Sequence, residues 1–284
     1  MKIFMGSFFL CSILAAAQTA SVSIPRPLAL DRLQQPPSDL FALTPSKVYA
    51  LHDDGENLKI VGSFQLPSFE SPSDLVAAII RKQQFVIVSG YDPNRGGFIN
   101  LYTPLGQLTE TWTSQQPLCG MDYDAKDTIY TVSCETNEIL QASLQRKGAI
   151  TFVTAIVGAH HLGPVIVDNV RGQLIVGEID NGEIYSVDLK TRRSRLLARG
   201  LGTPQAFTFS SNLQQLFIAD SSRRTIYRLD LTTTSPSLVP FGVLAQFREP
   251  DGLALLSAAR VAVADDRANA IFVLPSSGQP KLVK

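Results

Sequence analysis

Several polar side chains in this sequence stand where a turn leads into an apolar run. Glu70 lies in "FESPSDL", Gln205 in "TPQAF" and Asp251 in "EPDGL", each within two residues of a proline. His160 and His161 stand in "AHHLGPV", ahead of another apolar run. Carboxylates and histidines can act as general acids and bases when they reach the reacting atom. We predict catalytic roles for Glu70, His161 and Asp251. Gln205 and His160 are predicted to contact the substrate.

Three further residues lie on loops that follow apolar runs. Tyr91 and Arg95 belong to "GYDPNRGG", and Arg267 belongs to "DDRAN". A tyrosine ring can form an apolar wall of a binding site, and an arginine can pair with an anionic group of a substrate. We therefore predict that Tyr91, Arg95 and Arg267 contact the substrate, although loop arginines are commonly solvated or paired within the protein.

Each of these residues also has a purely structural interpretation. Asp251 in Pro-Asp-Gly is typical of a turn, and Glu70 can be an exposed loop acid. Adjacent residues of a strand point to opposite faces, so at most one of His160 and His161 can point inward. The acids that follow second strands, among them Asp220 and Asp265, recur in the late repeats, which favours a role in closing turns.

An internal repeat in the sequence predicts the strands that would hold these candidate residues. Six leading segments contain Pro37, Pro72, Pro117, Pro164, Pro204 and Pro250, so the period is 35 to 47 residues. Each leader is followed by short β-rich runs, for example "QLFIAD", "TIYRLDL" and "RVAVADD". Four short strands per unit at this period are typical of a β-propeller blade. The first unit is short, and the N-terminal "VSIPRPLALD" is expected to supply it with a strand.

The predicted fold is all-β: a six-bladed β-propeller with four-stranded antiparallel blades around a central channel. Runs that lead the units read as nearly continuous apolar segments, as expected for strands packed on both faces. If the leaders begin the innermost strands, one residue per leader converges on the channel axis. The candidate residues Glu70, His161, Gln205 and Asp251 would then meet there.

The N-terminus predicts export. Lys2 is followed by an apolar run over residues 3–17 and then by small residues, which is the layout of a secretory signal peptide. We predict a signal peptide over 1–20, an N-terminal strap over 21–36 and one propeller domain over 37–284, in a secreted protein. Cleavage leaves Cys119 and Cys134. Their hairpin sets Cys134 about opposite Pro117, so a disulfide is possible but not determined by the register.

Composition bears on the partners. The chain has 284 residues with 25 Lys and Arg and 25 Asp and Glu, a formal net charge of zero. This balance gives no electrostatic signature of nucleic acid or of an anionic membrane surface. The predicted partner is a small organic molecule in the central cavity, with no nucleic acid and no membrane. A protein partner is possible but has no support in the sequence.

The repeats resemble a known group of propellers. "PDGLALLSAARVAVADDRANAIFVL" and "TPQAFTFSSNLQQLFIADSSRRTIYRLDL" resemble NHL-type repeats and blades of the SMP-30/gluconolactonase and strictosidine-synthase-like superfamily of six-bladed propellers. The residue-level resemblance covers about 160–275. Lactonase-type members hold a divalent cation at the channel mouth, and the resemblance implies Glu70 and Asp251 as metal ligands here. Gln205 stands where an Asn is expected, and another Asn position falls near His161 and Leu162.

The resemblance leaves the cofactor open: none, or one divalent cation such as Ca²⁺, Mg²⁺ or Zn²⁺. Hard cations prefer oxygen ligands, and a histidine would favour Zn²⁺. Three functions follow from it. The preferred one is a metal-independent enzyme of secondary metabolism that catalyses cyclisation, condensation or cycloaddition, as hetero-Diels–Alderase-like or strictosidine-synthase-like propellers do. The alternatives are a metal-dependent lactone or ester hydrolase and a non-catalytic NHL-type binding scaffold.

Overall fold

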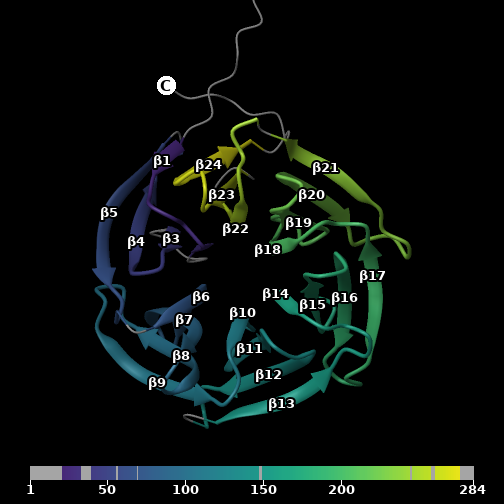
Figure 1. Ribbon diagram of the computed structural model, residues 1–284, viewed down its shortest axis with the longest axis horizontal. Helices are drawn as coiled ribbons and strands as arrows, with labels where there is room; N and C mark the ends of the chain where they lie inside the picture. The colour runs from purple at the N-terminus through teal and green to yellow at the C-terminus, as the bar shows by residue number, and fades with distance from the viewer. Residues whose placement is uncertain are drawn as a thin grey trace, which may run out of the picture.

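The computed structural model describes residues 21–32, 40–55, 57–68, 70–146, 149–243, 245–256 and 260–275. These residues form six four-stranded antiparallel sheets that are arranged as a ring around a central axis (Figure 1). The predicted six-bladed β-propeller is confirmed. The predicted signal peptide over 1–20 lies outside the described residues. The described part of the chain contains no helix long and apolar enough to cross a membrane.

Each blade runs from an innermost strand at the channel to an outermost strand at the edge of the ring. Blade 1 contains β2 (Ala29–Arg32), β3 (Leu40–Leu43), β4 (Lys47–Asp53) and β5 (Leu58–Gln65). Blade 2 contains β6 (Ser71–Ile80), β7 (Gln83–Asp92), β8 (Gly96–Tyr102) and β9 (Leu108–Ser114). Blade 3 contains β10 (Leu118–Tyr123), β11 (Thr128–Ser133), β12 (Glu138–Ser143) and β13 (Ile150–Ala155).

The second half of the ring follows the same plan. Blade 4 contains β14 (Leu162–Asp168), β15 (Gln173–Glu178), β16 (Glu183–Asp188) and β17 (Ser194–Arg199). Blade 5 contains β18 (Pro204–Phe209), β19 (Gln215–Asp220), β20 (Thr225–Asp230) and β21 (Leu238–Val243). Blade 6 contains β22 (Pro250–Leu255), β23 (Val261–Asp265), β24 (Ala270–Leu274) and finally β1 (Ser21–Ser23).

The N-terminal segment closes the ring. β1 pairs antiparallel with β24, with Val22 opposite Ile271, so the first and last parts of the chain share blade 6. β2 then begins blade 1 as its innermost strand. The segment predicted as a strap over 21–36 therefore contributes strands to two blades. The run "LFAL" at 40–43, which follows Pro37 of the first predicted leader, is the second strand of blade 1 and not its innermost strand. β1 thus covers the edge of β24 and becomes the outermost strand of blade 6.

The core lies between the blades. Six hydrophobic clusters of buried residues each join two neighbouring blades, including the junction of blade 6 with blade 1. Ile24, fully buried, packs in that junction against residues of both blades. The strands between two clusters bury both faces, which explains their nearly continuous apolar sequences.

Five of the six inner strands share an irregularity near their start. The register with the second strand shifts between Pro72 and Asp74, Leu118 and Met121, Leu162 and Val165, Pro204 and Ala206, and Pro250 and Gly252. A bulge of this kind re-aims the side chain of the extra residue. Within the shifts fall residues that line the central cavity: Ser73, Cys119, Gly163, Gln205 and Asp251.

The bulge in β10 also settles the pairing of the two cysteines. As the hairpin register predicts, the N–H of Cys134 donates to the carbonyl of Pro117, at 3.0 Å. The bulge then brings Cys119 beside Cys134, with 5.2 Å between their Cα atoms, and the two form a disulfide. The bond ties the start of the inner strand to the turn between β11 and β12.

Candidate functional site

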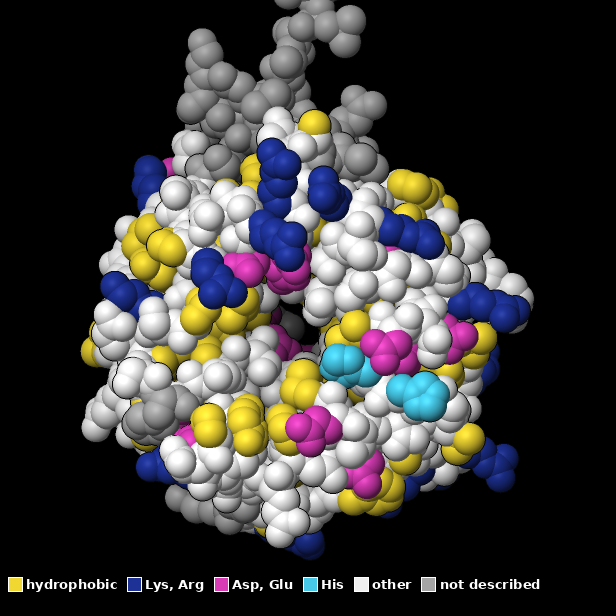
Figure 2. All heavy atoms as spheres, viewed as in Figure 1, with side chains coloured by type: hydrophobic (Ala, Val, Ile, Leu, Met, Phe, Trp, Pro, Cys, Tyr) yellow, Lys and Arg dark blue, Asp and Glu magenta, His cyan; other side chains and the backbone are white. Residues whose placement is uncertain are grey.

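The candidate site is the central channel, a cavity of about 1030 Å³. Residues of all six inner strands line it, from the starts of the strands to their ends. Figure 2 shows its opening, with Asp and Glu side chains on the wall and Lys and Arg side chains beside them at the upper rim. Seven carboxylates line the cavity: Asp31, Asp74, Asp122, Asp168, Glu249, Asp251 and Asp266. Arg32 is the one cation among the described lining residues.

Asp251 lies in the bulge of β22 and lines the cavity, where the sequence predicted it. Burial, together with the negative charges of Glu249 and Asp266, raises the pKa of its carboxyl to about 8, and a hydrogen bond from the backbone of Asp266 partly opposes this shift. A carboxyl group in such surroundings is protonated at neutral pH and can donate a proton or a hydrogen bond.

The neighbours of Asp251 are held in place by arginines and by a buried acid. Glu249 forms an ion pair with Arg267. Asp266 pairs with Arg26 at 3.0 Å. Beneath them Asp265 is fully buried, and its carboxylate accepts backbone N–H groups from the leader and from the following turn: Arg248 at 2.7 Å, Glu249 at 2.9 Å and Ala268 at 2.9 Å. These bonds fix the backbone that presents Asp251.

The structural role predicted for the recurrent acids is confirmed at Asp220 as well. Asp220 accepts the N–H groups of Gly202, Thr203 and Arg223. In blade 4, however, Glu178 takes this position and accepts the N–H of Asn181 at 2.6 Å.

Three aspartates on inner strands, which the corner motifs do not indicate, form a second acidic group. Each accepts the N–H of the next residue in its own strand and one N–H from the inner strand of the next blade. Burial raises each pKa to about 7. The bonds between blades join Asp31 to Ala77 at 2.7 Å, Asp74 to Met121 at 2.7 Å and Asp122 to Val167 at 2.6 Å. The available signal was an Asp inside an otherwise apolar inner strand, as in "LALDRL" and "GMDYD".

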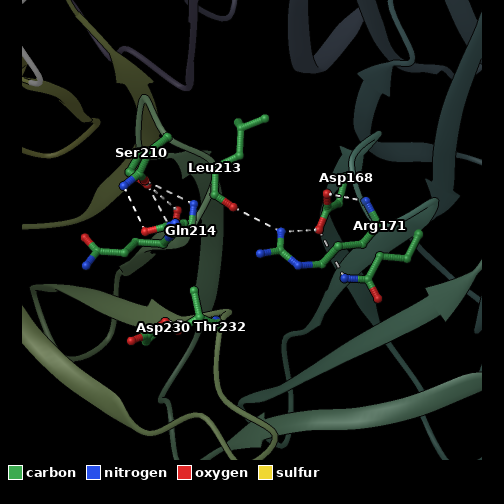
Figure 3. Close-up of polar contacts among 10 residues, drawn as sticks. Asp168, Arg171, Ser210, Leu213, Gln214, Asp230 and Thr232 are labelled. Atoms are coloured by element: carbon green, nitrogen blue, oxygen red, sulfur yellow. Dashed lines mark hydrogen bonds and ion pairs between the residues drawn. The ribbon is translucent and has the colours of Figure 1, made fainter.

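The inner strands begin at one mouth of the channel and end at the other, and Figure 3 shows polar contacts of residues at the ends of β14 and β18. Asp168, at the end of β14, lines the cavity there and accepts a bond from Arg171 Nη1 at 2.9 Å. The same nitrogen donates to the carbonyl of Leu213 at 3.0 Å, so Arg171 joins blade 4 to the β18–β19 turn of blade 5. Ser210 in that turn lines the cavity too. At this mouth Arg171 therefore neutralises the charge of Asp168 and links two blades.

His160 and His161 lie at the rim and are not among the residues that line the cavity. His161 Nδ1 is 3.6 Å from Asp180 Oδ1, and its side chain is 40 % exposed. The backbone N–H groups of His160 and His161 both point to Glu178 Oε1, at 3.5 Å. The bulge of β14 falls at Gly163, which places that residue, and not His161, on the channel wall.

Glu70 lies away from the channel wall, beside the third strand of blade 2. Its Oε1 accepts a bond from Asn100 Nδ2 at 2.9 Å, and the same nitrogen is 3.1 Å from the hydroxyl oxygen of Tyr102. Glu70 Oε2 and Asn100 Oδ1 are buried without a partner among the described residues. Burial raises the pKa of the Glu70 carboxyl. The structure therefore does not place Glu70 with Asp251 in the cavity.

The donor set at the channel mouth does not fit the implied divalent cation. Among the residues within the five bulges, Asp251 is the one carboxylate, Gly120 and Gly163 have no side chain, and Cys119 is bound in the disulfide. Within the described ranges of the chain, no three His, Cys, Asp or Glu side chains are grouped so as to hold a metal. A hard cation needs several oxygens at fixed distance.

The predicted substrate contacts divide into two sets. Gln205 lines the cavity and, like Asp251, lies in a bulge. Tyr91, 36 % exposed, lies on β7 outside the cavity lining. Arg95 is 3.7 Å from Asp92, and its side chain is 57 % exposed. Arg267 reaches the mouth only through its ion pair with Glu249.

Comparison with known proteins shows the fold. No model of a known protein family matches the chain, and no curated protein matches it. A propeller chain from a nidogen–laminin complex superposes with a TM-score of 0.70 at 17 % identity, covering 86 % of this chain and 90 % of that one. An auxiliary nutrient-binding protein from Bacteroides thetaiotaomicron gives 0.69 at 11 %, covering 88 % and 69 %. A luciferin-regenerating enzyme gives 0.59 at 13 %, covering 73 % and 74 %. These likenesses concern the fold alone.

Proposed function

We propose that this protein binds a small organic molecule in the central channel and transforms it by acid–base chemistry at Asp251, without a metal. The observation that carries the proposal is a carboxyl group on the cavity wall whose pKa is raised to about 8 by burial and by neighbouring acids. A catalytic acid or base is most effective when its pKa lies near the working pH.

The reaction classes that suit this site are cyclisation, condensation and cycloaddition. In these reactions a protonated carboxyl polarises a carbonyl or imine by donating a hydrogen bond, and the cavity supplies orientation and exclusion of water. Gln205 can hold a polar group of the ligand from the neighbouring blade. A wall with seven carboxylates favours a neutral or cationic ligand over an anionic one.

Secretion and membership of the SMP-30/gluconolactonase and strictosidine-synthase-like superfamily belong to this proposal. The Cys119–Cys134 disulfide supports export, since disulfides persist in oxidising compartments. The repeat pattern of residues 160–275 and the propeller architecture support the superfamily. A second candidate function is binding without catalysis. It is favoured by Asp31, Asp74 and Asp122, whose carboxylates are engaged by backbone N–H groups.

The test is a screen of small organic molecules with conversion followed by liquid chromatography and mass spectrometry. Wild type, Asp251→Asn and the control Asp180→Asn are compared. Asp180 is an exposed rim acid, so its variant controls for the same substitution outside the cavity. We expect Asp251→Asn to bind the ligand but to lower turnover by about 10²-fold or more, with Asp180→Asn unchanged.

Two outcomes would count against the proposed reaction. Full turnover by Asp251→Asn would remove Asp251 from the mechanism. Tight binding without conversion in the wild type would select the binding function instead.

A further inference from the structure

The outer edge of blade 4 carries an unbalanced group of cations. Residues 190–199 read "KTRRSRLLAR", and Lys190, Arg192, Arg193, Arg195 and Arg199 are all exposed. They occupy the β16–β17 turn and β17 itself, the outermost strand of the blade. Figure 2 shows Lys and Arg side chains protruding from this right-hand edge of the molecule.

The other outer strands lack such a group. β13 and β21 contain no charged residue, β9 contains one acid, Glu110, and β5 contains one cation. That cation, Lys59, is paired with Asp54 at 2.8 Å. In a chain with equal numbers of acids and bases, surface charges of both signs are expected to be interspersed. The concentration on β17 is therefore specific to this blade.

Arg193, Arg195 and Arg199 have no partner within the described protein, and Lys190 has only a charge interaction with Asp188. The side chains of Lys190, Arg193, Arg195 and Arg199 form neither a hydrogen bond nor an ion pair there, whereas Arg192 Nη1 donates to the carbonyl of Val153 at 3.2 Å. The nearby acids are already engaged. The carboxylate of Asp188 accepts the backbone N–H groups of residues 190 and 191, and that of Glu183 accepts the Tyr185 hydroxyl at 2.5 Å.

We propose that this edge of blade 4, defined by Lys190, Arg193, Arg195 and Arg199, binds a sulfated polysaccharide. Three of the four are arginines, whose planar guanidinium presents several N–H donors to the oxygens of an anion. Arg193 to Arg199 spans roughly 20 Å of strand, which suits a linear chain with repeated anionic groups. This site lies on the outside of the ring and is independent of the channel.

The structure argues against two other anionic partners. An acidic peptide added as a fifth strand would need a regular backbone edge, but the register of β17 shifts at Leu197, between the pairs Ile184–Ala198 and Tyr185–Leu196. Bulges of this kind protect sheet edges from strand addition. Single-stranded nucleic acid is bound with the help of exposed aromatic rings, and the aromatic residue here, Tyr185, is only partly exposed and bonded to Glu183.

The test is chromatography of the full chain on immobilised heparin at neutral pH with a sodium chloride gradient, followed by titration of soluble heparin. Wild type is compared with Arg195→Ser/Arg199→Ser. The matched control is Lys126→Ser/Arg146→Ser, which removes two exposed cations from blade 3. We expect the β17 variant to elute at lower salt and to bind heparin about tenfold or more weakly at low salt, with the control unchanged. Thermal unfolding of each variant checks that the fold is retained.

Three results would overturn the proposal. The first is a wild-type protein that passes the column unretained at low salt. The second is an equal loss of affinity in the control, which would mean attraction by the general surface charge. The third is displacement from heparin by polyglutamate or duplex DNA at lower concentration than by soluble heparin, which would assign the edge to a peptide or to nucleic acid.

Discussion

At the level of single residues, Asp251 owes its properties to where its backbone is held. The buried Asp265 fixes the leader through three backbone bonds, and the bulge of β22 turns Asp251 into the cavity. Glu249 and Asp266 lie close enough to disfavour its ionisation, while Arg267 and Arg26 pair with them. The group is thus placed to titrate near neutral pH because burial and like charges act together.

Substitutions of Glu70 distinguish a structural role of this residue from a catalytic one. Its Oε2 and Asn100 Oδ1 are both buried acceptors without a partner in the described part of the chain. Glu70→Gln replaces one acceptor with a donor, so we expect the free energy of unfolding at pH 7 to stay equal or to rise. Glu70→Ala leaves Asn100 Nδ2 without its carboxylate partner. We expect this variant to have a free energy of unfolding lower by about 1–3 kcal/mol.

Urea denaturation measures both Glu70 variants, and turnover or ligand binding provides the second readout. Glu70 lies outside the cavity lining, so Glu70→Gln should retain function. Loss of function with unchanged stability in that variant would restore the catalytic role that the sequence suggested.

At the level of elements, the inner strands determine what the channel can hold. They approach one another closely where glycines stand, and Gly120 is the clearest case. A Cβ on Gly120 in β10 would overlap the carbonyl oxygen of Gly163 in β14. We expect Gly120→Ala to lower the free energy of unfolding by more than about 2 kcal/mol, because two backbones must move apart.

The matched control for Gly120→Ala is Gly62→Ala on the outer strand β5, where a Cβ meets nothing within 4 Å. There the substitution should leave stability unchanged or slightly raised, since alanine restricts the unfolded chain. Equal effects of the two substitutions in urea denaturation would show that the inner strands are not in this close contact.

The disulfide is a second feature of the elements with a measurable consequence. It joins cysteines 15 residues apart and ties β10 to the β11–β12 turn at the mouth. Replacing both with serine is expected to lower the free energy of unfolding by about 3 kcal/mol through the greater freedom of the unfolded chain. Denaturation of the double variant, beside the wild type with and without reductant, measures this. A variant as stable as the oxidised wild type would contradict it.

The sequence predicted five of the six inner strands because their leaders carry a proline or glycine corner ahead of an apolar run. For the first unit it predicted a strand supplied by "VSIPRPLALD" but did not place this strand innermost, since "ALDR" at 29–32 has only four residues and lies in a segment rich in proline and leucine. For the site, the corner motif located Asp251 and Gln205 correctly on the channel wall. The motif does not give the register of each bulge, and this register is why His161 and Glu70 point elsewhere.

At the level of the whole molecule, the ring depends on the junction between the two ends of the chain. Ile24, fully buried, follows β1 and packs between blade 6 and blade 1. We expect Ile24→Ala to lower the free energy of unfolding by about 3 kcal/mol, because it leaves a cavity at the closure. The control Val61→Ala on the exposed face of β5, where the side chain is 59 % exposed, should change it little.

Calorimetry of these two variants also reports on cooperativity. A weakened junction lowers the single unfolding temperature of the entire ring if all blades unfold together. An Ile24→Ala protein with wild-type stability would mean that the N-terminal strand is dispensable for closure.

The channel of the closed ring contributes to the pH dependence of stability. An acid with a higher pKa in the folded than in the unfolded chain binds more protons when folded, so its ionisation lowers the free energy of unfolding as pH rises. For Asp251 this loss runs from about its ordinary pKa of 3.8 up to about 8. In Asp251→Asn the free energy of unfolding should therefore fall less steeply between about pH 3.8 and pH 8 than in the wild type.

The proposed acid–base chemistry in the channel requires that the pKa of the Asp251 carboxyl is raised, and a titration of this group tests it directly. Carbon-13 NMR of aspartate-labelled protein, with Asp251→Asn to assign the signal, follows its ionisation from pH 4 to pH 9. We expect a midpoint near 8. A midpoint near the ordinary value of 3.8 would show an ionised, solvated turn residue and would rule out Asp251 as the acid or base of the proposed reaction.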